Sequence, residues 1–131
     1  MHIKRLIGSL IAACCLLASP ASAAVIYNGN TYLLTSASTT WTAAEAEAVT
    51  AGGHLAAIND ASENRFLSTA FGSSSTRLWI GFNDVATEGT FVWSNGDAVT
   101  YTNWAVFELN NLGGEDYTVI NWGAGGTWND C

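Results

Sequence analysis

Apolar residues recur along the chain with two spacings, and each spacing belongs to a different part of it. Over residues 41–50 and 60–71 the apolar side chains stand three and four positions apart, which places them on one face of an α-helix. Both segments carry an oxygen-bearing residue with a glutamate three positions later, a pattern typical of helix N-termini: Thr42 with Glu45, and Asp60 with Glu63. We therefore predict two helices in the first half of the chain.

The remaining apolar residues form short runs bounded by glycine and asparagine, as β-strands often are. The runs are 25–34, which an Asn28-Gly29 turn interrupts, and 78–82, 90–93 and 117–122. Because the helices come early and most strands come late, the predicted fold class is α+β with antiparallel strands. Residues 105–115 follow neither spacing, and an irregular run of that length inside a small domain is usually either functional or disordered.

Residues 1–23 have the organisation of an export signal. Two basic residues precede a long apolar run, and small residues form a cleavage pattern that ends at Ala23. Cleavage there would leave one domain at 24–131, secreted or periplasmic, with no apolar stretch long enough to span a membrane. Two alternatives stay open: an uncleaved anchor helix, and a lipoprotein attached through Cys14.

The charge balance excludes some classes of partner. The whole chain carries a net charge of −7, and loss of the leader would remove Lys4 and Arg5. Only Arg65 and Arg77 would then stand against 11 acidic residues, a net charge of −9. Nucleic acids and anionic membranes require a basic surface that such a domain lacks, whereas a cation would suit it. Cys131 would be the single remaining cysteine, so no internal disulfide is expected.

An ordered set of short motifs identifies a family. The motifs are Thr40-Trp41, Gly52-Gly53-His54-Leu55-Ala56, Trp79-Ile80-Gly81, Asn103-Trp104, Glu115-Asp116-Tyr117 and Trp128-Asn129-Asp130. Together they resemble the C-type lectin-like domain, in a secreted member of bacterial type, over essentially all of 24–131. The resemblance implies two helices, a lower and an upper antiparallel sheet, and a long loop that binds calcium in many members. Family members continue into a last strand that pairs with the first. We therefore expect a domain that is incomplete after Cys131, with an open edge along 25–34.

The irregular run and the residues before Cys131 supply carboxylate and amide oxygens, which calcium prefers. No Lys or Arg lies between Trp79 and Cys131, so gathering these acids without a cation would be costly. The resemblance implies a principal calcium site, which is also the carbohydrate site, at Glu108, Asn110, Glu115, Asn129 and Asp130. It implies an auxiliary calcium site at Asp84, Glu88, Asn111 and Asp116. From composition alone, ordinary solvated loop residues remain the alternative.

The order Glu108-Leu109-Asn110 resembles the mannose- and glucose-type members of the family. Leu109 stands where sugar-binding members have proline in a cis peptide, and a cis peptide before a residue other than proline costs about 2.5–4 kcal/mol. We expect a secreted, calcium-dependent carbohydrate-binding module whose partner is a glycan or glycoprotein. The alternative is a lectin-like protein-interaction or adhesion module of the cell envelope that does not bind sugar.

An enzymatic function is not expected. His54 would be the single histidine left after loss of the leader, and the sequence offers it no nucleophile at a readable spacing. Glu115 and Asp116 are adjacent, so on a strand their side chains would point apart, unlike a catalytic carboxylate pair.

Overall fold

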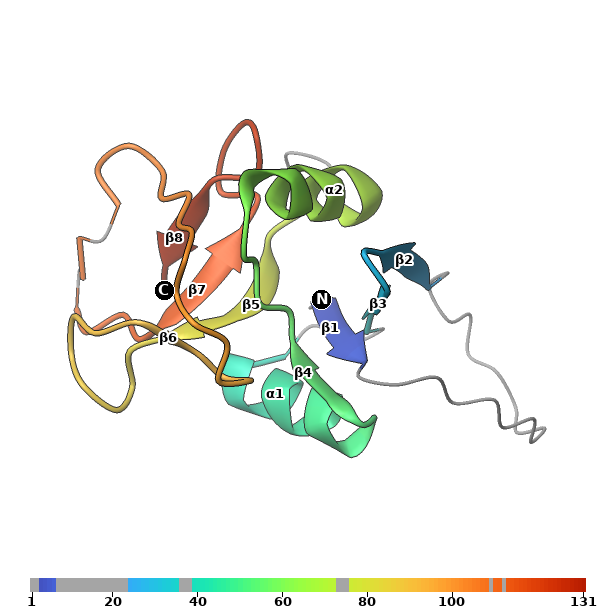
Figure 1. Ribbon diagram of the computed structural model, residues 1–131. Helices are drawn as coiled ribbons and strands as arrows, with labels where there is room; N and C mark the ends of the chain where they lie inside the picture. The colour runs from blue at the N-terminus through green and yellow to red at the C-terminus, as the bar shows by residue number, and fades with distance from the viewer. Residues whose placement is uncertain (1–2, 7–23, 36–38, 73–75, 109, 112) are drawn as a thin grey trace.

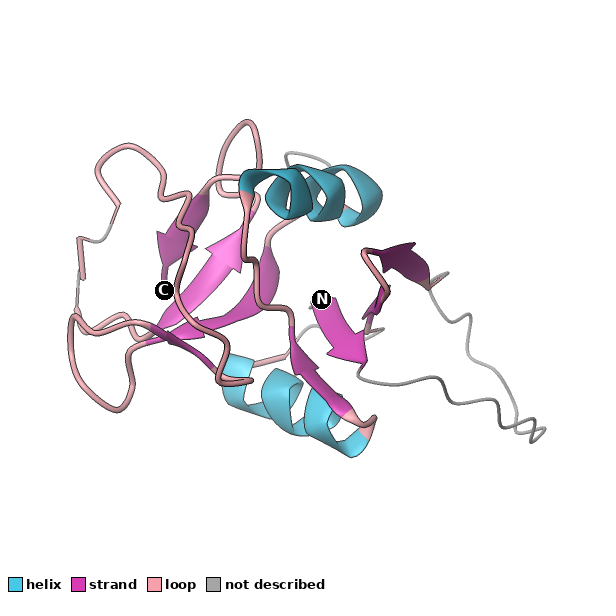
Figure 2. Ribbon diagram, viewed as in Figure 1, coloured by secondary structure: helices cyan, strands magenta, loops and turns pink. Residues whose placement is uncertain are grey.

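The computed structural model describes residues 3–6, 24–35, 39–72, 76–108, 110–111 and 113–131. The helices within these ranges are α1 (Trp41–Thr50) and α2 (Ala61–Phe71). A lower sheet has the strand order β2 (Val25–Tyr27), β3 (Asn30–Leu34), β1 (Ile3–Leu6) and β4 (Gly53–Leu55). An upper sheet has the order β6 (Val92–Trp93), β5 (Leu78–Asn83), β7 (Tyr117–Ile120) and β8 (Trp128–Asp130). Paired strands run antiparallel, as Figures 1 and 2 show, so the α+β prediction is confirmed.

Polar caps fix where both helices begin. The Thr40 hydroxyl accepts a hydrogen bond from an amide of the first turn at 3.4 Å, so α1 is capped two residues before the predicted Thr42. Glu45 does not serve the cap, and its carboxylate accepts from the Leu55 amide of β4 at 2.9 Å. The predicted cap of α2 is confirmed, because Asp60 accepts from two amides of its first turn. Side-chain oxygens thereby satisfy amides that would otherwise lack a partner at a helix start.

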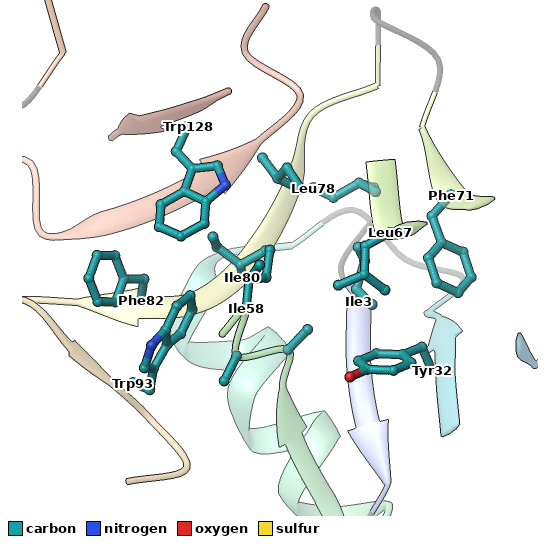
Figure 3. Packing of buried hydrophobic residues seen from close by; sticks show 13 residues of the cluster. Ile3, Tyr32, Ile58, Leu67, Phe71, Leu78, Ile80, Phe82, Trp93 and Trp128 are labelled. Carbon is teal, nitrogen blue, oxygen red and sulfur yellow. The ribbon is translucent and has the colours of Figure 1, made fainter. Parts of the chain in front are cut away.

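Aromatic side chains of the upper sheet pack against one another in the buried core (Figure 3). The Phe82 ring lies 4.4 Å from the Trp93 ring and 5.6 Å from the Trp128 ring, measured between centroids. Trp41, at the start of α1, donates its indole N–H to the Ile80 carbonyl at 2.7 Å. Most tryptophans therefore act as core anchors. Trp128 begins β8, whose next two residues belong to the predicted site, so the core fixes the position of that strand.

The strand β1 lies in the lower sheet between β3 and β4 and pairs with both (Figure 1). Ile3 is fully buried, and the Arg5 guanidinium makes an ion pair with Asp97 at 2.9 Å. The open edge that the sequence predicted along 25–34 is therefore absent at β3, which has a paired neighbour on each side, whereas β2 lies at the edge of the sheet. Cleavage after Ala23 would remove β1. The export signal at 1–23 stays a prediction, and most of it, residues 1–2 and 7–23, lies outside the described part of the chain.

Candidate functional site

The irregular run predicted to be functional is attached to the upper sheet at both ends. The Ala105 amide donates to the Trp128 carbonyl at 2.9 Å, and the Asp84 amide donates to the Asp116 carbonyl at 3.2 Å. Between these attachments the described residues of 105–116 project from the same side of the molecule as the turn after β5 (Figure 1). The loop, that turn and β8 therefore meet at one edge of the domain.

Asp130 is the most deeply buried acid of the predicted site, with 1 % of its surface exposed. Its Oδ2 accepts from the Asn111 amide at 3.1 Å, whereas its Oδ1 is buried and has no hydrogen-bond partner. A buried carboxylate oxygen without a partner is costly, and a bound cation would satisfy it. The neighbouring Asn129 is also buried, and it donates its amide N–H to the Cys131 sulfur at 3.1 Å, which leaves its Oδ1 as an acceptor.

Glu108 lies close enough to two other acids to be affected by their charge. The pKa of its carboxyl is raised, first by burial and then by the charges of Asp130 and Glu115, while a hydrogen bond from Asn110 works in the opposite direction. That bond joins Asn110 Nδ2 to Glu108 Oε2 at 2.7 Å. Three predicted calcium ligands therefore lie near enough to repel one another, and such repulsion favours a cation among them.

Asn111 connects the principal and the auxiliary sets of predicted ligands. Its Nδ2 donates to Glu88 at 2.7 Å, and its Oδ1 accepts from the Glu115 amide at 2.8 Å. Asp84 has 2 % of its surface exposed, and its Oδ1 is a second buried carboxylate oxygen without a partner. Asp116 is joined to Asp84 through the backbone. The auxiliary residues are therefore brought together, although 23 positions separate Asn111 from Glu88 in sequence.

The donor set fits a hard cation such as calcium, which binds carboxylate and amide oxygens. Within the described ranges, no three His, Cys, Asp or Glu side chains already stand close enough to hold a metal ion. Binding would therefore need the amide oxygens and an inward turn of the more exposed carboxylates. The prediction about Leu109 and its peptide falls outside the described residues and stays a prediction.

Two apolar side chains beside the site were missed by sequence reasoning. Val106 and Phe107 immediately precede Glu108 and are 82 % and 91 % exposed. Phe107 also has a φ of 73°, a left-handed conformation that bulky residues rarely adopt. The available signal was two adjacent large apolar residues directly before Glu108.

Replacing Phe107 by glycine is expected to leave the free energy of unfolding unchanged or to raise it by up to about 1.5 kcal/mol. The left-handed conformation costs a side-chain-bearing residue about 1–2 kcal/mol, and glycine adopts it freely while adding about 0.5–1 kcal/mol of chain entropy. Val106→Gly is the matched control, because Val106 does not have this conformation and should lose about 0.5–1 kcal/mol. Urea unfolding measures both. Equal losses in the two variants would contradict a strained Phe107.

Comparison with known proteins identifies the class of the domain. The family model described as the Lectin C-type domain matches residues 37–131. Because this match covers most of the chain, the chain belongs to the C-type lectin domain family, a class of carbohydrate-binding domains whose members generally bind Ca²⁺. This membership confirms both the predicted fold and the expectation that the chain is not an enzyme. No helix within the described parts of the chain is long and apolar enough to cross a membrane.

Two curated relatives and one solved structure that resemble the chain are named as lectins. The alpha-N-acetylgalactosamine-specific lectin of Patiria pectinifera is 41 % identical over 114 residues, which cover 79 % of this chain and 68 % of that lectin. Lectin BRA-3 of Megabalanus rosa is 37 % identical over 107 residues, or 79 % of this chain and 65 % of that lectin. The chain thus spans about two thirds of each. The crystal structure of C-type lectin CEL-I from Cucumaria echinata matches with a TM-score of 0.77 at 29 % identity, covering 82 % of this chain and 85 % of CEL-I. These relatives are eukaryotic, so the bacterial-type assignment has no support among them.

Proposed function

We propose that the chain is an exported, calcium-dependent carbohydrate-binding module whose site lies where the loop 105–116 meets β8. The observation that carries the proposal is the buried, unpartnered Oδ1 of Asp130 within a cluster of acids. The ion would be held by Glu108, Asn110, Glu115, Asn129 and Asp130. An auxiliary ion would be held by Asp84, Glu88, Asn111 and Asp116. When bound, calcium supplies a positive centre to which two neighbouring hydroxyl oxygens of a sugar can attach.

Glu108 and Asn110 would select the orientation of the sugar. A carboxylate accepts from one hydroxyl, and an amide N–H donates to the next, so the pair complements two adjacent hydroxyl groups. The two side chains bond to each other at 2.7 Å, so a sugar would replace that hydrogen bond rather than add to it. Each contact therefore contributes less net affinity than its geometry alone suggests.

The Glu-Leu-Asn order favours mannose or glucose, while the relative from Patiria pectinifera is named for N-acetylgalactosamine. Chromatography of the full chain on immobilised mannose and on immobilised N-acetylgalactosamine tests the proposal. We expect retention on mannose with calcium and elution by a chelator. Retention on N-acetylgalactosamine alone would correct the sugar class. Failure to bind either column in calcium would overturn carbohydrate binding for these two classes.

The response of calcium binding to pH follows from the raised pKa of Glu108. Protonation of Glu108 removes a calcium ligand. The calcium-induced rise in melting temperature should therefore shrink as the pH falls through this raised pKa. Because the pKa is raised, the decrease should begin above the usual glutamate value of about 4.3. Without calcium the sign reverses: the stability linked to Glu108 is present below the raised pKa and is lost as the pH rises through it. Melting curves from neutral to acid pH, with calcium and with a chelator, measure both effects. In Glu108→Gln the effect seen in chelator should disappear, and the calcium effect should begin at a lower pH, because other carboxylate ligands remain.

The exposed Val106 and Phe107 favour a second candidate, a protein-interaction module. Exposed aromatic side chains beside a polar site are typical of protein contacts. A partner captured by the immobilised chain, retained in chelator with excess mannose and lost with Phe107→Ser, would support this candidate. Capture that mannose or chelator abolishes would favour the carbohydrate module.

Export is proposed from the leader pattern in residues 1–23. The N-terminal sequence of the protein recovered outside the producing cell tests it. A start at Ala24 would support cleavage. A lipid-modified start at Cys14 would favour the lipoprotein alternative, and an intact Met1 would contradict cleavage.

A further inference from the structure

A polar pocket of about 440 Å³ lies between α2 and the glycine-rich segment 123–126, on residues outside the proposed calcium sites. Its volume falls within the range of small-ligand sites. Figure 1 shows α2 beside this segment, while the loop 105–116 projects elsewhere. The lining includes Asn64, Arg65, Ser68, Tyr101, Asn103 and Gly125.

Buried amide hydrogen bonds build one wall of the pocket. Asn64 is 2 % exposed, and it donates to the Gly126 carbonyl at 3.2 Å while accepting from the Trp128 indole at 2.8 Å. Asn103 donates to the same carbonyl at 3.0 Å. Gly126 packs so closely on α2 that a Cβ there would lie 2.7 Å from the Cβ of Ser68. The wall is therefore preorganised, which lowers the entropy that a ligand must lose on binding.

Arg65 supplies the charge of the pocket. The other two arginines are engaged, Arg5 by Asp97 at 2.9 Å and Arg77 by the Trp122 ring at 3.8 Å. Within the described residues Arg65 forms neither an ion pair nor a cation–π contact. A guanidinium is shaped for two parallel hydrogen bonds to a carboxylate. In a chain of net charge −7, a free guanidinium lining a pocket points to an anionic ligand.

Tyr101 adds an aromatic surface next to that charge. Its ring is held edge-on against Trp128 at 5.7 Å between centroids. The pKa of its phenol is raised by burial and by Asp60, and is opposed by Arg65, so both charged groups lie near the ring. The Asp60 carboxylate is already bonded to two amides of α2 at 2.8 and 2.9 Å. A fixed ring beside a guanidinium suits a sugar ring that carries a carboxylate.

We propose that this pocket binds a hexuronic acid residue without calcium, with Arg65 holding the carboxylate and Tyr101 and Asn103 contacting the ring. The proposal does not rest on the calcium site, because the two sets share no residue. It assigns the domain a second, charge-selective saccharide site.

Titration of the full ¹⁵N-labelled chain with glucuronate in a chelating buffer tests the proposal. We expect chemical-shift changes at the pocket amides, and affinity for glucuronate at least tenfold higher than for glucose, which has the same ring without the carboxylate. Arg65→Gln should lose at least tenfold in glucuronate affinity. Arg77→Gln, which removes the same charge from an exposed position outside the pocket, should bind like the unaltered chain.

Equal binding of glucose and glucuronate would overturn the proposal, as would an unchanged Arg65→Gln. Equal losses in both arginine variants would show general charge attraction and would also overturn it. Shifts that appear only with calcium, and at the loop rather than the pocket, would support the calcium-dependent site and contradict this one. Melting curves of both variants check that they are folded.

Discussion

Saturating calcium is expected to raise the melting temperature of the domain by about 10 °C or more, and a chelator is expected to reverse the rise. A ligand that binds the folded chain alone adds about 2.7 kcal/mol to the free energy of unfolding at a hundred times its dissociation constant. The physical reason lies in Asp130 and its neighbours, whose mutual repulsion and buried, unpartnered oxygen would be relieved by the ion. An unchanged midpoint would contradict the proposed cofactor.

Asp130→Asn separates this explanation from a general effect of calcium on an acidic protein. The side chain keeps its shape and loses its charge, so the variant should melt at or above the unaltered chain in chelator. Calcium should then raise its melting temperature by less than half as much. Glu47→Gln, on the exposed side of α1, removes one charge away from the site and should keep the full calcium shift. If both variants lose the calcium-induced rise in melting temperature equally, calcium binds through general charge attraction and not at one site.

Ile3→Ala in the full chain is expected to lower the free energy of unfolding by about 2–5 kcal/mol. Ile3 is fully buried in the core, and its strand occupies the lower sheet between β3 and β4. The cavity left by the smaller side chain would lie beside Tyr32 and Leu67, which belong to the same buried cluster. Denaturant unfolding of the chain with its N-terminal segment intact measures the loss.

Ile26→Ala is the matched control, because Ile26 lies in the same sheet but is 71 % exposed. Its expected loss is below about 0.5 kcal/mol. If Ile3→Ala is equally harmless, β1 does not form part of the folded domain, and 24–131 folds without it. A large loss for Ile3 alone would show that cleavage after Ala23 removes a structural strand as well as a leader.

The helices could be predicted because their signals are local. Spaced apolar residues and the cap at Asp60 lie within the segment that they organise. β1 could not be predicted, since Lys4 and Arg5 within an apolar context are typical of a leader and nothing local indicates a partner strand. Its pairing with β3 and β4 depends on segments more than twenty positions away. The spacing of Thr42 and Glu45 predicted a helix cap that does not form, because the Leu55 amide of β4 donates to the Glu45 carboxylate instead.

The family resemblance named the side chains of the proposed acidic site, but it gave no information about how they connect. The link from Asn111 to Glu88 joins two loops, and sequence spacing carries no information about it. The burial of Asp130 without a partner for one oxygen depends on the packing of β8. The left-handed conformation of Phe107 was not predicted, because bulky residues rarely adopt it. The pocket at Arg65 could not be predicted from the sequence, because α2 and the segment 123–126 meet only in the folded chain.

The placement of β1 has a consequence for how the backbone amides of the lower sheet exchange their hydrogens with solvent. In an antiparallel ladder the amides of one strand point alternately to its two neighbours, so those of β3 divide between β2 and β1. If β1 detaches, only the amides facing it become accessible, while those facing β2 stay protected. Alternate residues of β3 would then exchange at different rates, and the difference reports the free energy that holds the N-terminal segment in place.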